Sequence, residues 1–343
     1  MTAGSSYEYH THVGVRRWSG WLLAIVVLVI ACLLSLVVGV SHIPIREIIS
    51  ALWAPDGSPD DLVISEYRLP RTLLGLLAGS ALGVAGCLMQ GLTRNPLADP
   101  GLLGINAGAA FAIAVAVAYL GADSISSYVW FGFAGAAVVA VLVYRLGTVG
   151  RGGTDPIRLT LAGVAVTAVL TGVTKGLILL NSTAFDKMRQ WDAGALTGRG
   201  YDVLAGATPF IVAGTVLAFV AARSLNAVAL GDDLARALGV HVNRTRACTA
   251  LALILLCGTA TAAVGPITFV GLAVPHIARW IVGPDTRWIV AYSLVLAPAL
   301  VLFADVVGRV AIPPDELSAG VVTAFLGAPV LIWLARRSEM RQS

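Results

Sequence analysis

Residues 68–104 read RLPRTLLGLLAGSALGVAGCLMQGLTRNPLADPGLLG, and in this stretch a short polar segment separates two long apolar runs. The polar segment, TRNPLADP at residues 93–100, contains two Asx-Pro pairs, which begin at Asn95 and Asp99. Such pairs favour the start of a turn and disfavour helical geometry at the residue before the proline. The pattern predicts two helices that stop, turn and restart in a fixed geometry at this segment, which we call the 93–100 turn.

The composition indicates a membrane protein. Of the 343 residues, 57% are hydrophobic and only 12% are charged, whereas about a quarter of the residues in a soluble domain carry a charge. Each crossing needs about 20 mostly apolar residues, and the sequence accommodates about ten such spans. The expected fold is an all-α, polytopic membrane protein. The predicted spans are residues 21–40, 69–91, 101–121, 128–146, 158–181, 204–222, 247–264, 267–283, 288–308 and 317–335.

For two parts of this assignment, the length of the apolar run alone does not decide where a span lies. The first apolar run exceeds a typical signal-peptide core and ends without a convincing small-residue cleavage site, so we interpret it as a span. The apolar stretch from Leu251 to Val282 is long enough for two helices, and Gly265-Pro266 divides it because proline breaks a helix. The resulting domains are an amino-terminal tail (1–20), a transmembrane domain (21–335) and a carboxy-terminal tail (336–343).

Basic residues concentrate on one side of this topology. If the amino terminus is cytoplasmic, all but eight of the 23 basic residues lie on the cytoplasmic side, as the positive-inside rule expects. We therefore predict a multi-pass protein of the cytoplasmic membrane, in contact with lipid, with both termini cytoplasmic. The net charge of +4 follows from this topology and gives no reason to expect nucleic acid as a partner. The eight outer residues are Arg46, Arg68, Arg71, Lys175, Lys187, Arg189, Arg199 and Arg309.

Motifs for nucleotide, metal or covalent chemistry do not occur in the sequence. The phosphate-binding pattern G-x-x-x-x-G-K-[ST] is missing, and the glycine-rich segment 150–153 has neither its spacing nor its lysine. The four cysteines lie in apolar runs, without a C-x-x-C pair or a metal-ligand cluster. We therefore expect no catalytic residue, no metal site and no ATP binding by this chain itself.

Ionisable residues are also sparse in the middle of the predicted spans. A charge at the bilayer centre costs about 2.5–3.5 kcal/mol on insertion scales, so carriers coupled to protons keep conspicuous acids and bases there. Here Asp305 and Arg309, four residues apart on one helix, can pair near the outer surface. An ion-gradient-driven secondary transporter is the alternative class of function, and the missing acid–base pairs argue against it.

The loop between the sixth and seventh spans, residues 225–246, reads LNAVALGDDLARALGVHVNRTR. It is too polar to cross a membrane and too regular for a disordered linker. Either residue of the Asp pair at 232–233 can cap a short helix, on which Leu234, Ala237 and Leu238 lie on one face. That apolar face needs a partner, which is either the rest of this chain or a soluble protein that docks on it.

Five blocks of the sequence, taken in their order along the chain, form a recognisable pattern. They are RLPRTLLGLLAGSALGVAGCLMQGLTRNPLADPGLLGINAGAA, ALGDDLARALGV, GPITFVGLAVPHIARWIVGPD, ADVVGR and ELSAGVVTAFLGAPVLIWLARR. The series resembles the FecCD family, the membrane permeases of ATP-binding-cassette (ABC) importers for iron-siderophores, haem and cobalamin. The blocks follow the order of the family and cover nearly everything from Tyr67 to Arg337.

The resemblance implies a type II ABC importer permease fold. Two permeases, as a homodimer or a heterodimer, would form the translocation path at their interface. Two ATPase subunits, which hold the ATP and Mg, would bind on the cytoplasmic side, and a substrate-binding protein would dock outside. The implied function is transport of an iron-siderophore complex by a subunit that is not an enzyme. Import of cobalamin or haem is the alternative.

The resemblance also implies residue roles. The segment ALGDDLARALGV matches the coupling helix that inserts into the ATPase, and the implied contact residues are Gly231, Asp232, Leu234, Ala235, Ala237, Leu238 and Gly239. Arg68, Arg71 and Arg309 match arginines that related permeases present to acidic residues of the binding protein, with anchoring of helix ends or pairing with Asp305 and Glu66 as the alternative.

Three uncharged polar residues near the 93–100 turn are candidates for the path or its gate. They are Gln90, Asn95 and Asn106. A hydrophilic iron chelate needs a polar or weakly interacting wall. The alternative is that these side chains form hydrogen bonds within the chain.

Overall fold

The computed structural model describes residues 4–39, 43–53, 57–122, 124–148 and 156–339. The named elements in these ranges are all helical. They are α1 (Gly4–Val37), α2 (Ile45–Trp53), α3 (Pro59–Leu62), η1 (Val63–Arg68), α4 (Leu69–Thr93), η2 (Pro100–Leu103), α5 (Ile105–Tyr119), α6 (Ile125–Thr148), α7 (Pro156–Leu180), α8 (Ser182–Asp192), α9 (Tyr201–Ala229), α10 (Asp232–Ala237), α11 (Val242–Leu253), η3 (Ile254–Gly258), α12 (Thr259–Val264), α13 (Val270–Val282), α14 (Thr286–Ala311) and α15 (Ala319–Glu339). The glycine-rich segment 150–153 and residues 1–3 and 340–343 of the predicted tails lie outside the described residues.

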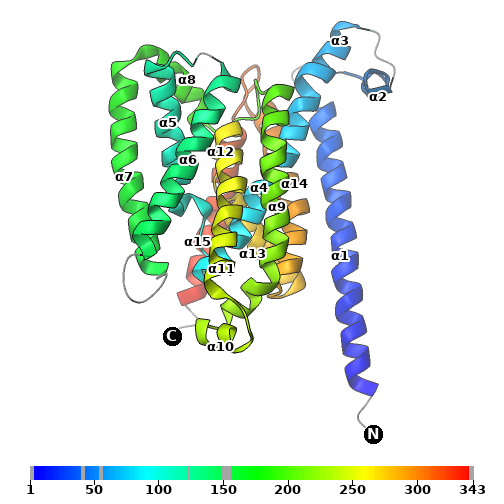
Figure 1. Cartoon of the computed structure of the whole chain (residues 1–343). Coiled ribbons are helices and arrows are strands. Elements are labelled where there is room, and N and C mark those ends of the chain that lie inside the picture. Colours follow the sequence, from blue (N-terminus) through cyan, green and yellow to red (C-terminus); the bar gives the residue numbers. More distant parts are fainter. Residues whose placement is uncertain (1–3, 40–42, 54–56, 123, 149–155, 340–343) are drawn as a thin grey trace.

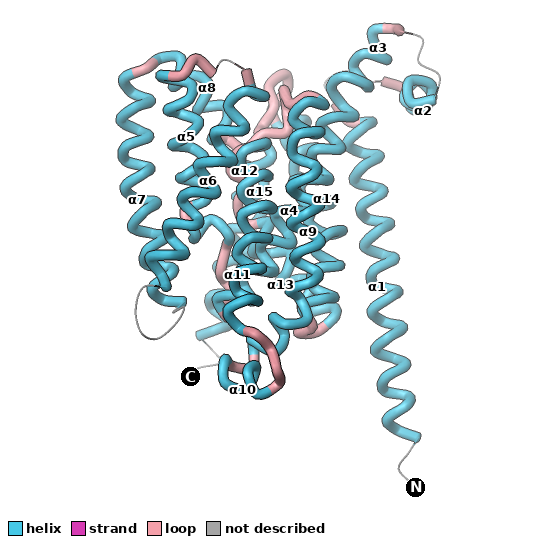
Figure 2. Tube along the Cα trace, in the orientation of Figure 1, coloured by secondary structure: helices cyan, strands magenta, loops and turns pink. Residues whose placement is uncertain are grey.

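The bundle has two ends, which we name the α3 end and the α10 end after the short helices located there (Figure 1). Helix α4 passes through the centre between them and contacts α14, α13 and α9. Helices α5, α6 and α7 form a group on one side, and α1 lies on the opposite side (Figure 2). The first turn of α1 and the last turn of α15 are both at the α10 end, so the two termini share one side of the bundle.

The predicted spans correspond to helices of the structure. Seven helical segments of the described chain are long and apolar enough to cross a membrane. Three shorter apolar helices, α5, α13 and residues 319–332 of α15, occupy the remaining predicted spans. The expected all-α polytopic fold is confirmed. The seven long segments are Arg17–Val37, Pro59–Thr93, Ile125–Gly147, Ile157–Leu180, Tyr201–Ala229, Val242–Val264 and Thr286–Ala311.

The break predicted at Gly265-Pro266 is present. Helix α12 ends at Val264, and Gly265 has a φ of +79°, a left-handed conformation that favours glycine. A Cβ atom at Gly265 would lie 2.1 Å from the carbonyl oxygen of Trp191, so the close approach of these two backbones also requires glycine. Helix α13 begins at Val270.

The 93–100 turn stops and restarts the helix as predicted. Arg94, directly after α4, is in the left-handed conformation with a φ of 52°. Asn95 and Asp99 each accept a hydrogen bond from the backbone N–H two residues later, at 2.9 and 2.8 Å. Burial raises the pKa of the Asp99 carboxyl, and the hydrogen bond from the backbone opposes that rise. The two Asx side chains therefore fix the geometry in which η2 and α5 follow α4.

Helix α4 contacts its neighbours through glycines. A Cβ atom at Gly79 would lie 2.5 Å from the Cα of Pro298 in α14, and one at Gly86 would lie 1.8 Å from the carbonyl oxygen of Gly271 in α13. Real Cβ atoms do not occur at such distances from backbone atoms. The glycines of α4 thus let three helix backbones meet directly, as small residues do at helix interfaces in membranes.

Candidate functional site

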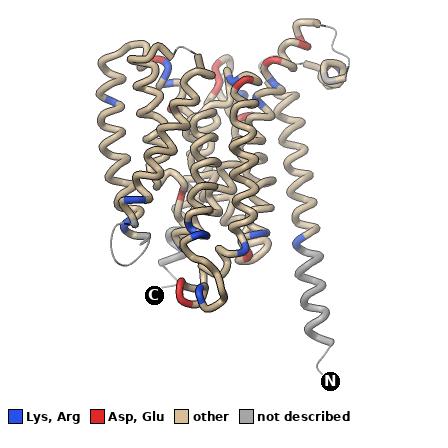
Figure 3. The backbone as a smooth tube through the Cα atoms, viewed as in Figure 1, with Lys and Arg blue, Asp and Glu red and all other residues tan. Residues whose placement is uncertain are grey.

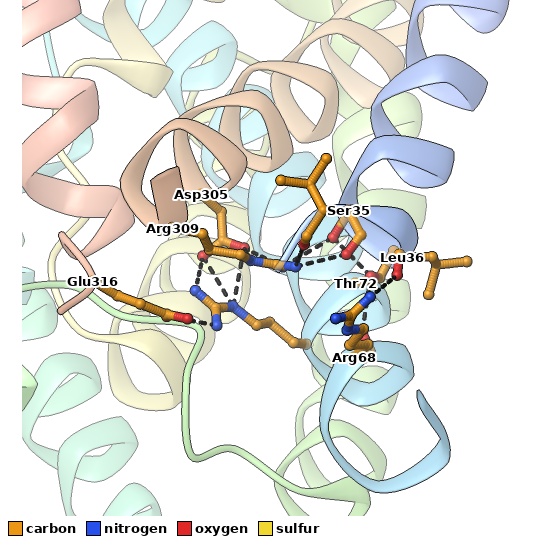
Figure 4. Close-up of polar contacts among 9 residues, drawn as sticks. Ser35, Leu36, Arg68, Thr72, Asp305, Arg309 and Glu316 are labelled. Atoms are coloured by element: carbon orange, nitrogen blue, oxygen red, sulfur yellow. Dashed lines mark hydrogen bonds and ion pairs between the residues drawn. The ribbon is translucent and has the colours of Figure 1, made fainter. Parts of the chain in front are cut away.

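The three arginines expected to contact a binding protein, Arg68, Arg71 and Arg309, line one cavity, and Figure 4 shows two of them, Arg68 and Arg309, next to the end of α1. Arg71 and Arg309 share the carboxylate of Asp305. Arg71 Nη2 donates to Asp305 Oδ1 at 2.8 Å, and Arg309 Nε donates to Asp305 Oδ2 at 3.1 Å. Asp305 is only 1% exposed, so the two guanidinium groups replace the water that this carboxylate loses on burial. The pairing of Asp305 with Arg309, predicted from their spacing, is confirmed.

Arg309 and Arg68 also hold the end of α1. Arg309 Nη1 donates to the carbonyl oxygen of Ser35 at 2.6 Å, and Arg68 Nη1 donates to that of Leu36 at 2.7 Å (Figure 4). Carbonyls in the last turn of a helix have no later N–H to bind. The two arginines supply these donors and thereby attach α1 to α14 and α4.

A cavity of about 630 Å³ opens beside this cluster at the α3 end. Arg71 Nη1 reaches along it to Glu316 Oε2, 2.8 Å away. Arginines outnumber acidic residues in its walls, so the cavity favours an anionic group. Its charged lining residues are Glu66, Arg68, Arg71, Arg199, Arg309 and Glu316.

Arg199 is the lining residue that the sequence patterns did not single out. It is 8% exposed, and its Nε has no hydrogen-bond partner within the described part of the chain. A buried donor without a partner costs free energy, so this side chain is available to an incoming acceptor. The only local signal is its position between Gly198 and Gly200, in a loop with no adjacent acid.

Unlike Arg199, the predicted docking arginines have hydrogen-bond partners among the described residues of their own chain. Arg68 and Arg309 are 5% and 4% exposed, and Arg71 binds two carboxylates of its own chain. The alternative weighed from the sequence, pairing with Asp305 and anchoring of a helix end, describes their contacts in the isolated chain. Their contact with a binding protein stays a prediction.

At the opposite end, α10 forms within the predicted loop. Gly239, directly after the C-cap residue Leu238, has a φ of +78°, the left-handed conformation in which glycine commonly ends a helix. One detail of the prediction was wrong: neither aspartate caps the helix, because Gly231 is at the N-cap position and no side chain caps it. Ala235, which the resemblance includes among the contact residues, faces the bundle and is buried with Val228 and Val242.

The apolar residues expected on one face of α10 are instead open to solvent. Leu234 is 49% exposed and Leu238 is 60% exposed. Ala237 is exposed as well. Within the part of the chain that the structure describes, nothing covers them, which favours a soluble partner over an intrachain one.

Asp232, the first residue of α10, binds two arginines instead of capping the helix. Its carboxylate pairs with Arg94 of the 93–100 turn and with Arg246 of α11, the latter at 3.1 Å. This contact joins the predicted coupling helix to the end of α4.

The three polar residues proposed for the path or gate have partners inside the chain. Gln90 is 3% exposed and accepts a hydrogen bond from Arg279 Nη2 at 2.9 Å. Asn106 Oδ1 accepts one from Thr261 Oγ1 at 3.0 Å, and Asn95 binds within the turn. Their role in a path stays a prediction, because the structure holds one permease copy and the path is expected between two.

A bundle of membrane-crossing helices, with an exposed short helix at one end and an arginine-lined cavity at the other, defines the class as a polytopic membrane protein with a candidate site at each end. Comparison with known proteins identifies the family. The FecCD transport family matches residues 27–337, and the chain belongs to it. The subunit is therefore the permease of an ABC transporter and not an enzyme, since ATP hydrolysis resides in a separate subunit of such transporters.

Relatives match over nearly their whole length. The ferric enterobactin transport system permease protein FepD of Escherichia coli (strain K12) is 50% identical over 314 residues, 91% of this chain and 93% of the relative. The probable siderophore transport system permease protein YfiZ of Bacillus subtilis (strain 168) is 38% identical, over 94% and 96% of the two chains.

A solved structure shares the fold. The inward-facing conformation of a metal-chelate type ABC transporter superposes with a TM-score of 0.80, over 93% of this chain and 99% of that one, at 24% identity.

The shared carboxylate at the α3 end can be tested by the Asp305→Asn substitution. It leaves the Arg71 and Arg309 guanidinium groups facing a neutral amide in a buried site, and the expected loss in the free energy of unfolding is about 3 kcal/mol or more. The measurement is denaturant unfolding of the purified chain in detergent micelles. The matched control is Glu316→Gln, which removes the outer, 28% exposed partner of Arg71 and should cost at most about 1 kcal/mol. Equal, small losses for both variants would contradict the assigned role of Asp305.

Proposed function

We propose that this chain is the permease subunit of an importer for an iron-siderophore complex. The observation that carries the proposal is the 50% identity, over 91% of the chain, to a permease named for ferric enterobactin. Other similar proteins are named for siderophores, ferric citrate and ferric hydroxamates. Cobalamin or haem as the ligand is the alternative within the class.

The proposed orientation puts the α10 end in the cytoplasm. Basic residues at this end include Arg17, Arg145, Arg158 and Arg223, and Figure 3 shows that charges are few along the middle of the bundle. The positive-inside rule supports this orientation, with both termini cytoplasmic. The α3 end then faces outward, where a binding protein can reach the arginine-lined cavity, and a second permease copy completes the path.

The function is tested by reconstitution in liposomes with the ATPase, the binding protein and ferric enterobactin as the probe. Uptake should require ATP, because the described acid–base pairs lie near the ends of the spans and not in the middle, where proton coupling would need them, and it should require the binding protein, as the resemblance implies. Cobalamin and haem with the same components are the matched alternatives. Uptake without ATP would indicate a secondary transporter, and uptake of cobalamin or haem but not of the ferric probe would replace the proposed ligand.

The exposed apolar side chains of α10 support its proposed contact with the ATPase. Leu234 and Leu238 lie one helical turn apart at the proposed cytoplasmic end and are left exposed by the described residues of this chain. An exposed apolar pair on a charged helix is a suitable anchor for a cleft on a soluble partner. Ala235 faces the other way and serves to seat α10 on the bundle.

The double substitution of Leu234 and Leu238 by aspartate should detach the ATPase and leave the permease folded, since both side chains are exposed. The measurement is co-purification of the ATPase, with an expected loss of at least about tenfold. The matched control places aspartate at Ile45 and Ile49, two exposed apolar residues four apart on α2 at the opposite end. Undiminished co-purification of the α10 variant would refute the docking role.

The outer cavity is the proposed docking site for an acidic side chain of the binding protein. Arg71 and Arg309 are already engaged by Asp305, whereas Arg199 is buried at the cavity with a free donor. A carboxylate that enters the cavity gains a charge-assisted hydrogen bond from Arg199. The positive potential of the neighbouring residues Arg68, Arg71 and Arg309 then attracts and orients this carboxylate.

Arg199→Gln should weaken docking of the binding protein by about tenfold at low salt, and the difference from the native chain should shrink as salt is added. The measurement is binding of the labelled binding protein to the permease in nanodiscs. Arg46→Gln is the control, because Arg46 is an exposed outer arginine on α2 outside the cavity. Equal docking by both variants would exclude Arg199 as the donor to the carboxylate of the binding protein.

A further inference from the structure

The contact between α10 and the 93–100 turn is made by charged groups more than by apolar surface. Helix α10 has six residues, and only Ala235 among them is buried. The described ion pairs that join α10 to the rest of the chain both use Asp232, with Arg94 on one side and Arg246 on the other. Apart from the packing of Ala235 against Val228 and Val242, the position of α10 relative to the bundle therefore depends on one carboxylate.

The backbone at Arg94 supports a specific role for its side chain. Arg94 adopts the left-handed conformation at the end of α4, where glycine is the usual residue because it avoids a steric cost. An arginine at this position accepts that cost and keeps a side chain that reaches α10. Backbone strain of this kind is concentrated at functional sites.

Arg246 makes Asp232 difficult to move independently. The Arg246 side chain is 8% exposed, and Asp232 is the acid with which it pairs in the described chain. Arg94 is more accessible, at 38%, and it connects the same carboxylate to α4. A displacement of α10 therefore pulls on α4 through Arg94 or leaves two arginines without their acid.

Helix α4 carries an ion pair at each end. At the cytoplasmic end Arg94 binds Asp232, and at the outer end Arg71 binds Asp305 and Glu316 beside the cavity. Between these points the glycine contacts with α14 and α13 leave no room for bending toward those helices. One close-packed helix thus spans the distance between the coupling helix and the outer cavity (Figure 1).

We propose that the Asp232–Arg94 ion pair is the link through which movement of α10 is passed to α4. Asp232 and Arg94 are positioning residues, and their function is to keep α10 and α4 moving together. The inference rests on the proposed function, in which the ATPase moves α10. Because coupling between two sites is reciprocal, docking at the outer cavity biases α10 through the same pair.

The link is first tested in the permease alone, without partners, by hydrogen exchange of the α10 backbone in detergent. Arg94→Gln and Asp232→Asn should each speed exchange by about fivefold, the size expected for an ion pair between partly exposed groups. The double variant should exchange no faster than Asp232→Asn, because Asp232→Asn already breaks the contact that Arg94→Gln removes. Asp233→Asn is the matched control, since Asp233 is a fully exposed neighbour that pairs only within α10.

The second test uses the reconstituted transporter. For Arg94→Gln the ATPase concentration needed for half-maximal binding and the basal ATP hydrolysis should stay within about twofold, whereas uptake and stimulation of hydrolysis by the binding protein should fall by about tenfold. Arg94→Lys, which keeps the charge, should restore part of the uptake and part of the stimulation of hydrolysis by the binding protein. A merely structural role would lower binding, basal hydrolysis and uptake together.

The outcomes separate the link from the proposed function. If α10 exchange is unchanged in both variants, or if the two substitutions add in the double variant, the pair does not hold α10 and the inference is overturned. If the variants only raise the ATPase concentration that is needed, Asp232 is a docking contact and not a link. If the native chain binds no ATPase, the proposed function fails, while the exchange measurement still decides whether the pair fixes α10 to α4.

Discussion

The direct backbone contact of α4 with α14 and α13 is the constraint on which the rest of the structure depends. In a bilayer the solvent is as apolar as the side chains, so helices associate through close packing rather than through expulsion of water. Gly79 and Gly86 allow that packing, and α4 becomes the central element around which the other helices are arranged. A helix held in this way transmits displacement along its length better than one packed through flexible side chains.

Charges are concentrated where this central helix ends. At the α3 end one carboxylate, Asp305, joins α4, α14 and, through Arg309, the last turn of α1. At the α10 end Asp232 joins α10 to α4 and α11. Each acid is shared by two arginines, which satisfies partly or fully buried groups and fixes several helices with a single contact. The surfaces proposed for the two soluble partners are both built next to such a carboxylate.

Local patterns predicted much of this arrangement. The 93–100 turn, the break at Gly265-Pro266 and the pairing of Asp305 with Arg309 depend on residues within a few positions of each other, and each is confirmed. The cap assigned to the Asp pair of α10 was wrong for an instructive reason. Asp232 is a residue type that caps helices well, but its carboxylate is bound instead by arginines that are 138 and 14 residues away in sequence.

The sequence by itself determined the class of protein, the membrane-crossing helices and the family, because apolar length, turn chemistry and ordered motif blocks are local properties that survive without coordinates. Only the tertiary structure decided which arginines bind an acid of the same chain. Arg71 meets Asp305 across 234 positions, whereas Arg199 is buried at the cavity with a donor that has no partner among the described residues. The physical reason is that hydrogen-bond and ion-pair partners are assigned by helix packing, and no spacing along the chain encodes which distant groups that packing brings together.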